Sequence, residues 1–503
     1  MLITCVRSTR YNESSNSQAR QVKDGFISAL HRMTDVEVIT ETTRLRSYES
    51  DGLSAIKGLP RVVVIPSTML GLQALVRFAS EWGVPLVARG AGTGLSGGAT
   101  PHPEGVLVSL AKFREIVSID VENRRARVQP GVTNLAISEA VSEYGLFYAP
   151  DPSSQIACTI GGNVAENSGG VHCVKYGLTL HNVTGLEVML MSGERVSIGY
   201  EESSSHQPDL LALLHGSEGM LGVITEVEVL LTPKPEAVAV ILAAFQEVSS
   251  AADAVGAIFA DGLVPAGLEM MDRLAIQAAE TFVHAGYPLD AEAMLLIELD
   301  GTVAEIDSLI EKTLTILKLQ GAHQSDVERS EEGRTRLWMG RKAAFPAVGR
   351  ISPDYYCMDG TIPRRHLAEV LERIGLLSER YGLRVANVFH AGDGNLHPLI
   401  LFDANVKGEL ERAEAFGADI LTLCIEFGGT ITGEHGVGLE KINQMCVQFD
   451  DAALEIFHGV KAVFDERGLL NPGKAVPTLS RCAEFGAMHV HKGQMPHPHL
   501  ERF

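Results

Sequence analysis

A glycine-rich segment, Arg89–Gly98, constrains the fold of this chain more than any other feature of its sequence. Three of its glycines have the spacing G-x-G-x-x-G, which in a Rossmann fold must lead straight into a helix. Here Pro101 and Pro103 follow, and then a β-branched run, so the segment is not a Rossmann loop. A glycine-rich turn between two strands can still bind phosphate through its backbone N–H groups, and Arg89 would add positive charge. The alternative is a tight turn without a ligand.

Two further clusters of glycine and small polar residues lie downstream, at residues 151–177 and 216–225. Small residues allow the backbone to approach a flat ligand closely, and amide side chains can satisfy the polar atoms of that ligand. One such cluster could be turn chemistry alone. Three of them in one region indicate a large, extended cofactor.

The region around these clusters reads as short strands alternating with a few helices. Apolar residues at helical spacing over Leu72–Ala79 predict a helix with Ser67 as its N-cap and Gly83 past its end. A second helix over residues 137–144 is expected to end at Gly145. Apolar, β-branched runs predict strands at Arg61–Pro66, Pro85–Gly90, Val106–Leu110 and Arg125–Val132.

The motif Thr-Pro-Lys-Pro, which ends at Pro235, marks a boundary because proline cannot continue a helix or the interior of a sheet. Beyond it, helix-like and strand-like stretches alternate up to residue 475, so the fold class is α+β. We therefore expect an N-terminal helical segment (1–50), a cofactor-binding domain (51–235), a second α+β domain (236–475) and an extended tail (476–503).

A different set of motifs predicts a metal centre. His390 and His397 flank a glycine-rich turn between two predicted strands, Val385–His390 and Leu396–Phe402. Folding back through that turn can place both imidazoles on one face of a sheet. Glu434 lies in another glycine-rich stretch, and two histidines with one carboxylate suit a divalent metal such as zinc or manganese. The alternative is a pair of hydrogen-bonded core histidines.

Composition limits the possible partners. The net charge of -21 argues against nucleic acid, which needs a clustered basic surface. The residues up to Gln18 are polar, and the apolar runs are too short to span a membrane. The seven cysteines include no C-x-x-C pair and no spacing familiar from iron–sulfur proteins. We therefore expect a cytoplasmic chain whose electrons leave through a partner or a diffusible acceptor.

The three glycine-rich clusters resemble the FAD-binding domain of the vanillyl-alcohol oxidase superfamily. The resemblance implies a two-subdomain FAD-binding domain followed by an α+β cap domain that carries the substrate site. Many members carry a histidine for a covalent flavin bond where this chain has Ala99, so we expect FAD to bind non-covalently. The positions implied to bind FAD are Arg89, Gly90, Gly92, Thr93, Gly94, Ser96, Gly97, Asp151, Pro152, Thr159, Gly161, Gly162, Asn163, Asn167, Gly169, Gly170, Tyr176, Gly177, Glu218, Gly222, Val223, Ile224 and Asn471.

The histidine motifs resemble the D-2-hydroxy-acid dehydrogenase branch of that superfamily. The resemblance implies that His390, His397 and Glu434 bind the metal and that His435 is the general base. It also places Arg341 at the substrate carboxylate, a role that suits the planar guanidinium with its paired donors. The implied reaction removes the hydroxyl proton while the α-hydride passes to flavin N5.

The segments Gly340–Pro363 and Arg481–His491 are similar to the larger FAD subunits of bacterial glycolate oxidases, and the similarity runs nearly end to end. It implies oxidation of glycolate, and of D-lactate, to glyoxylate and pyruvate. Cys357 stands where 2-hydroxyglutarate enzymes have a substrate lysine, which favours a short acid. The implied partners are a second FAD-binding subunit and an iron–sulfur subunit, which would also supply any contact with the inner face of the membrane. The tail histidines could dock on a partner or be solvated: His489, His491, His497 and His499.

Three alternatives remain. A stand-alone D-lactate dehydrogenase would use the same chemistry, and only substrate profiling separates the two. A non-redox use of the fold, as in ether-lipid synthesis, is disfavoured by the metal motif. A subunit that binds FAD only as an electron relay would need neither Arg341 nor His435.

Overall fold

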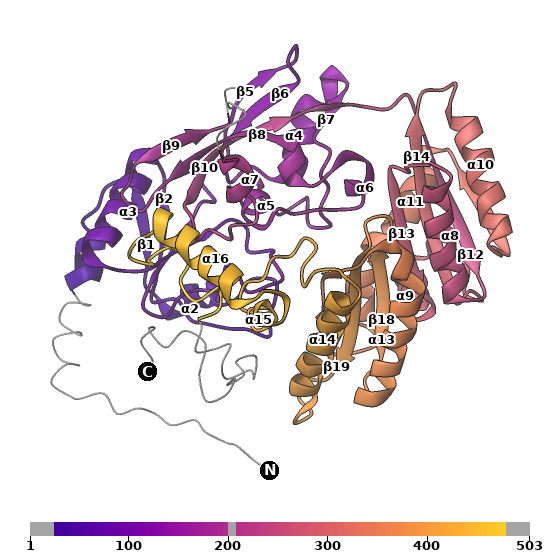
Figure 1. The fold of residues 1–503 in the computed structure, drawn as a ribbon. Helices are drawn as coiled ribbons and strands as arrows, with labels where there is room; N and C mark the ends of the chain where they lie inside the picture. The colour runs from indigo at the N-terminus through magenta and orange to yellow at the C-terminus, as the bar shows by residue number, and fades with distance from the viewer. Residues whose placement is uncertain (1–24, 200–207, 479–503) are drawn as a thin grey trace.

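The computed structural model describes residues 25–199 and 208–478, within which the chain forms three larger sheets and one two-stranded ribbon (Figure 1). Sheet A has the order β1-β2-β4-β3, with β1 antiparallel to β2 and the other pairs parallel. The segment 1–50 is therefore not simply helical as expected. Residues 25–30 are helical, but β1 joins sheet A, and residues 1–24 lie outside the described part. The strands are β1 (Val36–Ile39), β2 (Val62–Pro66), β3 (Leu86–Arg89) and β4 (Val106–Ser109).

Helix α3 (Met69–Trp82) connects β2 to β3, as the apolar spacing predicted. Its N-cap is Thr68, whose hydroxyl accepts a backbone N–H of the first turn, and not Ser67 as expected. The Ser67 hydroxyl donates to the Asp35 carbonyl instead. Gly83 ends the helix at a φ of 64°, a left-handed conformation that glycine adopts without steric cost.

Sheet B is antiparallel, in the order β5-β6-β10-β8-β9, and a small ribbon pairs β7 with β11. Strand β6 ends at Val128, earlier than the expected Val132, because the chain turns at Pro130. The strands are β5 (Ile116–Asp120), β6 (Arg125–Val128), β7 (Leu146–Phe147), β8 (Val183–Met189), β9 (Arg195–Ile198), β10 (Val223–Leu230) and β11 (Thr232–Pro233). The helices of this half are α2 (Thr42–Leu45), α4 (Asn134–Val141), α5 (Ile160–Glu166), α6 (Cys173–Tyr176), α7 (Leu210–Leu214), η1 (Arg46–Tyr48), η2 (Ser142–Tyr144) and η3 (Thr179–Asn182).

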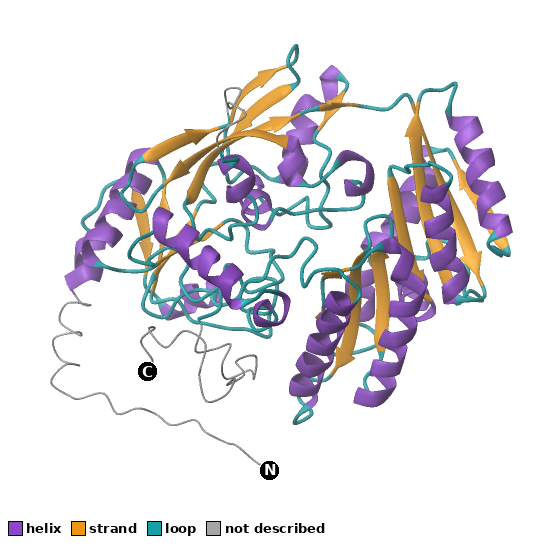
Figure 2. Ribbon diagram, in the orientation of Figure 1, coloured by secondary structure: helices purple, strands orange, loops and turns teal. Residues whose placement is uncertain are grey.

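Sheet C follows the proline-rich boundary and is antiparallel, in the order β15-β12-β14-β13-β18-β19-β16, with β17 also paired to β19. Alternate residues of β12 enter two separate cores, so both faces of the sheet are covered by helices (Figure 2). The strands are β12 (Ala237–Phe245), β13 (Gly267–Asp272), β14 (Ala293–Gly301), β15 (Gln324–Glu328), β16 (Asp354–Cys357), β17 (Gly360–Thr361), β18 (Val385–His390) and β19 (Asn395–Phe402). One face carries α8 (Val248–Ala260), α10 (Ile306–Leu319), α13 (Leu367–Tyr381) and α14 (Glu409–Glu426), and the other α9 (Arg273–Val283), α11 (Glu331–Lys342) and α12 (Ala344–Val348).

After α14 the chain returns to the first half of the molecule. Figure 1 shows α16 (Asp451–Phe464, yellow) beside sheets A and B, whereas α14 lies against sheet C. Leu470 forms a bridge with Leu86 at the edge of β3, and the backbone N–H of Asn471 donates to the Leu86 carbonyl. The return brings residues 430–440 between the two halves. The remaining short helices are η4 (Arg364–His366) and α15 (Met445–Gln448).

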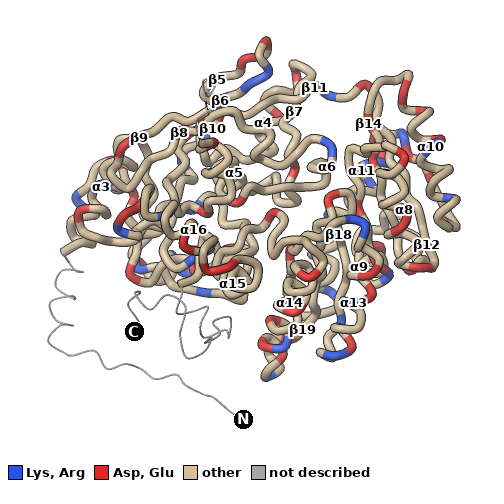
Figure 3. Tube along the Cα trace, in the orientation of Figure 1, with Lys and Arg blue, Asp and Glu red and all other residues tan. Residues whose placement is uncertain are grey.

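Acidic and basic residues are interspersed along both halves of the trace (Figure 3), in keeping with a net charge of -21. No helix in residues 25–199 or 208–478 is both long enough and apolar enough to cross a membrane. The tail histidines from His489 onward lie outside the described residues.

Candidate active site

Residues from both halves of the chain line one cavity of 410 Å³. The first half contributes the glycine-rich segment and residues near α5, and the second half contributes Arg341, His390, His397, Glu434 and His435. All five residues predicted for catalysis or metal binding thus meet at one place. The predicted FAD positions on the same wall are Arg89, Gly90, Gly92, Thr93, Gly94, Pro152, Thr159, Gly161, Gly162, Asn163, Glu218, Gly222 and Ile224.

The glycine-rich loop presents its backbone to this cavity. Gly92 has a φ of 73°, and a side chain there would collide with the Arg89 guanidinium. The Arg89 Nη1 donates to the Ser50 carbonyl at 2.8 Å, which fixes the cation beside the loop. The buried Thr159 hydroxyl has no hydrogen-bond partner among the described residues, so it is available to a ligand. This combination fits a long ligand with a phosphate group, as FAD has.

Ten predicted FAD positions are not among the residues that line the cavity. They are Ser96, Gly97, Asp151, Asn167, Gly169, Gly170, Tyr176, Gly177, Val223 and Asn471. Among them, the Asp151 carboxylate contacts His172 Nδ1 at 2.8 Å, and the Tyr176 hydroxyl donates to Asp300 on β14. Asn471 donates to the Gly98 carbonyl at 3.0 Å. These side chains support the cavity walls or join the two halves of the molecule.

Strands β18 and β19 place His390 and His397 together. The register pairs Val388 with His397 and His390 with Asn395, so the two histidines occupy diagonal positions on one face. Their ring centroids are 5.0 Å apart. The Glu434 Oε1 lies 3.2 Å from His390 Nε2 and 3.0 Å from His397 Nε2. The expected one-face arrangement is present, with the carboxylate between the two rings.

The other nitrogen of each ring has an acceptor of its own. His390 Nδ1 lies 2.7 Å from Glu269 Oε1, and His397 Nδ1 lies 3.4 Å from the Met358 carbonyl. With a metal ion bound, the proton of each ring would lie on Nδ1, which would leave both Nε2 lone pairs for the ion. Histidines that bind metals are typically oriented by such acceptors. The three ligand atoms lie within 4.8 Å of one another, and this donor set fits a divalent metal.

The charges around these histidines favour a cation. Burial lowers the pKa of His390, but the Glu269 and Glu434 carboxylates outweigh burial and raise that pKa to about 10. Burial raises the pKa of the Glu434 carboxyl, yet His390 and His397 hold it well below its ordinary value. A metal ion would satisfy the same electrostatic demand by replacing the proton between these groups.

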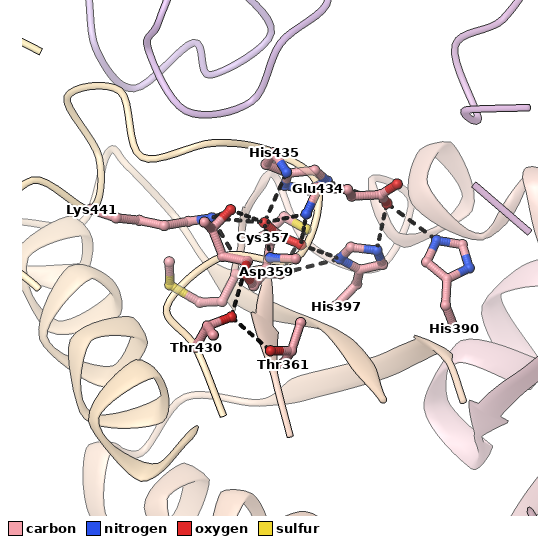
Figure 4. A network of polar contacts seen from close by, with 12 residues as sticks. Cys357, Asp359, Thr361, His390, His397, Thr430, Glu434, His435 and Lys441 are labelled. Carbon is pink, nitrogen blue, oxygen red and sulfur yellow. Dashed lines mark hydrogen bonds and ion pairs between the residues drawn. The ribbon is translucent and has the colours of Figure 1, made fainter. Parts of the chain in front are cut away.

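Asp359, which the sequence did not indicate, holds the loop that carries Glu434 and His435 (Figure 4). Its carboxylate accepts the backbone N–H groups of Gly433 (3.0 Å), Glu434 (3.2 Å) and His435 (2.9 Å). The same carboxylate pairs with Lys441 Nζ at 2.9 Å, and both side chains are 0% exposed. Burial raises the pKa of Asp359, but Lys441 and His435 hold it far below its usual range.

His435 lies flat against His397, with ring centroids 5.0 Å apart and an interplanar angle of 8°. Its Nε2 is 4.0 Å from Glu434 Oε1, too far for a hydrogen bond. Burial, opposed by Asp359 and reinforced by His397 and Lys441, lowers the pKa of His435 to about 4. His435 is therefore neutral near pH 7 and can accept a proton.

Arg341 is only 2% exposed, although its side chain reaches the cavity wall. Its Nε donates to Glu269 Oε2 at 2.8 Å. Its Nη2 lies 2.7 Å from the same oxygen but is not aligned with a hydrogen-bond acceptor in the described part of the chain. A buried guanidinium with a donor to spare beside the histidines can bind a small carboxylate.

Three residues that shape this site were not predicted from the sequence, and a fourth has a contact in addition to its predicted one. Glu218, predicted to contact FAD, also accepts the backbone N–H groups of Val437 and Gly438, both at 2.7 Å. Glu269, Asp359 and Lys441 were not predicted. Glu269 had a detectable signal, since a carboxylate inside the apolar run of β13 must find buried partners.

Residues 60–199 match the family "FAD binding domain", and residues 234–475 match "FAD linked oxidases, C-terminal domain". The chain is 60% identical to glycolate oxidase subunit GlcD of Escherichia coli (strain K12) over 93% of this chain and 94% of that protein. The chain belongs to the FAD-linked oxidases. This FAD-linked oxidase is also 39% identical to GlcD of Bacillus subtilis (strain 168), covering 85% and 91% of the two chains. Its identity to D-lactate dehydrogenase of Anaerostipes hadrus is 34%, covering 83% and 90%.

Solved structures confirm the α+β fold class. The FAD-linked oxidase superposes on p-cresol methylhydroxylase with a TM-score of 0.76 at 17% identity, covering 92% of this chain and 98% of that one. For alkyldihydroxyacetonephosphate synthase the TM-score is 0.68 at 16% identity, covering 94% and 86%. The expected resemblance to flavin subunits of glycolate oxidase is confirmed by the relatives, and FAD is the cofactor that the matched domain binds.

Proposed function

We propose that this FAD-linked oxidoreductase of 2-hydroxy acids oxidises glycolate, and also D-lactate, to glyoxylate and pyruvate. The observation that carries the proposal is the single cavity in which a glycine-rich FAD cradle, a His-His-Glu set, a buried arginine and a neutral histidine meet. A relay subunit would need only the cradle. The names of its relatives, glycolate oxidase subunit and D-lactate dehydrogenase, both denote enzymes of short 2-hydroxy acids.

His390, His397 and Glu434 would hold a divalent metal, zinc or manganese. When bound, the metal supplies a Lewis acid for the substrate oxygen, and FAD supplies the hydride acceptor. FAD would bind non-covalently, because Ala99 lines the cavity at the position where covalent members have a histidine.

The chain's own residues would orient the acid and move its proton. Arg341 binds the substrate carboxylate with the Nη2 donor that remains free of an aligned acceptor among the described residues. His435 then accepts the proton of the 2-hydroxyl group, a role for which its neutral form is required. Burial of both side chains excludes water from the reacting groups.

Electrons would leave through partner subunits. The Escherichia coli relative is named as a subunit, and we propose a second FAD-binding subunit and an iron–sulfur subunit as partners of this chain. The free cysteines of the described part are Cys158, Cys173, Cys357 and Cys424, and no three of them lie close enough together to bind a cluster. Any contact with the membrane would then be made by these partners.

The deciding experiment is an anaerobic titration of the purified, FAD-loaded chain. Glycolate and D-lactate should bleach the flavin absorbance. L-lactate should not, because a site that fixes the carboxylate and the hydroxyl presents the wrong face of its α-carbon. D-2-hydroxyglutarate should not, because Cys357 offers no cation for its second carboxylate. A flavin that glycolate and D-lactate both leave oxidised would contradict the proposal and favour an electron-relay subunit. Reduction by D-lactate alone would indicate a stand-alone D-lactate dehydrogenase.

Removal of a metal ligand should empty the site without unfolding the chain. We expect His390→Ala to weaken metal binding by more than about 100-fold, since loss of an outer partner of a ligand already costs about 10–100-fold. Competition with a chelator measures the affinity, and flavin absorbance shows that FAD is retained. The control is His323→Ala, an exposed histidine of the same half. Equal metal affinity in both variants would contradict the assignment.

A further inference from the structure

Glu269 lies on β13 and is 1% exposed, yet it contacts two separate parts of the site. Its Oε1 is 2.7 Å from His390 Nδ1. Its Oε2 is 2.8 Å from Arg341 Nε and 2.7 Å from Arg341 Nη2. One oxygen of the Glu269 carboxylate thus contacts His390 on β18, and the other contacts Arg341 on α11.

Both partners of Glu269 line the cavity, whereas Glu269 lies behind them. A buried carboxylate is costly unless each of its oxygens has a partner, so the pairing with Arg341 and His390 is strongly held. The backbone also holds Glu269 and His390 in place, because β13 pairs with β18 at Met270 and Phe389, the residues next to them in the chain.

We propose that Glu269 is a positioning residue that couples the metal site to the anchor of the substrate carboxylate. This inference rests on the proposed function. The hydroxyl and carboxylate of a 2-hydroxy acid stand on adjacent carbons, so the metal ligand and the arginine must keep a fixed separation. Glu269 sets that separation by holding His390 with one oxygen and Arg341 with the other.

Glutamine at this position weakens both contacts of Glu269. A carboxylate offers two acceptor oxygens, but the amide of glutamine offers one acceptor and one donor. Since His390 Nδ1 and Arg341 Nε both donate, Glu269→Gln leaves one of them facing an N–H group, and the other loses the negative charge of its acceptor. The variant keeps nearly the same volume, so the packing around β13 is preserved.

The experiment compares Glu269→Gln with a matched control, Glu298→Gln. Glu298 lies on the neighbouring strand β14 and contacts His172 Nε2 at 3.0 Å and Trp338 Nε1 at 2.6 Å, without touching Arg341 or His390. Metal affinity is measured by chelator competition. Anchor affinity is measured with propionate, a short monocarboxylate that has no 2-hydroxyl group and does not chelate the metal, through its perturbation of the flavin absorbance.

We expect Glu269→Gln to weaken metal binding by about 10–100-fold and to weaken propionate binding as well, while FAD stays bound. Glu298→Gln should change neither. Weakening of only one ligand in Glu269→Gln, or equal behaviour of the two variants, would overturn the coupling. If Glu269→Gln does not fold, Glu269→Asp keeps both acceptors on a shorter side chain and should still weaken both ligands.

Failure of the proposed function gives a different pattern. If wild-type protein binds no metal, or if His390→Ala binds it normally, the metal centre itself is wrong, whatever Glu269 does. If wild type and His390→Ala behave as proposed and Glu269→Gln matches its control, only the role of Glu269 is refuted.

Discussion

Replacement of His435 with alanine should lower the rate of flavin reduction by glycolate by about 10²–10⁴-fold, the usual contribution of a general base. The metal and FAD should remain bound, because the His435 ring is 4.0 Å from Glu434 and forms no bond to the proposed ligand set. Stopped-flow absorbance under anaerobic conditions measures the rate, and metal analysis of the same sample measures occupancy. Loss of rate with full occupancy is the expected result.

A second group of possible metal ligands includes His435, so the prediction must distinguish a general base from a metal ligand. Cys357, His397 and His435 also have ligand atoms within 4.8 Å of one another. If the metal binds there, His435→Ala and Cys357→Ser should both lose it, and Glu434→Gln should retain it. If the metal binds to His390, His397 and Glu434, Cys357→Ser should keep both metal and activity. Metal analysis of these three variants therefore separates a base from a ligand.

The site could be predicted where its signals are local. His390 and His397 flank one turn, so the strand pattern on either side was enough to place them on one face. The glycine-rich loop was recognisable because Pro101 and Pro103 exclude a following helix. Helix α3 could be read from its apolar spacing, and only its N-cap was misplaced by one residue.

Contacts between segments that are far apart in the chain could not be predicted from local sequence patterns. Glu269 is 121 residues from His390 and 72 from Arg341 in the chain, and no periodicity connects them. Asp359 and Lys441 are 82 residues apart. The return of Asn471 to the Gly98 carbonyl spans 373 residues, so the sequence alone could not show whether it contacts the cofactor or supports the loop. Such pairings depend on the sheet order, which the pattern of strands does not specify.

Replacement of Asp359 should strongly destabilise the fold. Asp359→Asn removes the charge that neutralises Lys441, and both side chains are 0% exposed. Breaking one partner of a buried ion pair typically costs about 3–5 kcal/mol, because the other charge stays buried without compensation. We expect the free energy of unfolding, measured by urea denaturation, to fall by that amount.

A double variant separates the stability effect from the effect on the site. Asp359→Asn/Lys441→Met removes the Asp359–Lys441 ion pair as a whole. Lys441 also lies 4.0 Å from the buried side chain of Glu440, but burial raises the pKa of Glu440 to about 8, so this carboxyl is largely neutral and most of the lost stability should return. Metal affinity should not return, because asparagine keeps only one acceptor for the N–H groups of Gly433, Glu434 and His435, which the carboxylate now holds. Lys441→Met alone should lose stability, since it leaves the Asp359 charge buried. If the double variant recovers both stability and metal affinity, Asp359 serves only to neutralise Lys441. If it recovers stability alone, Asp359 also holds Glu434 in position.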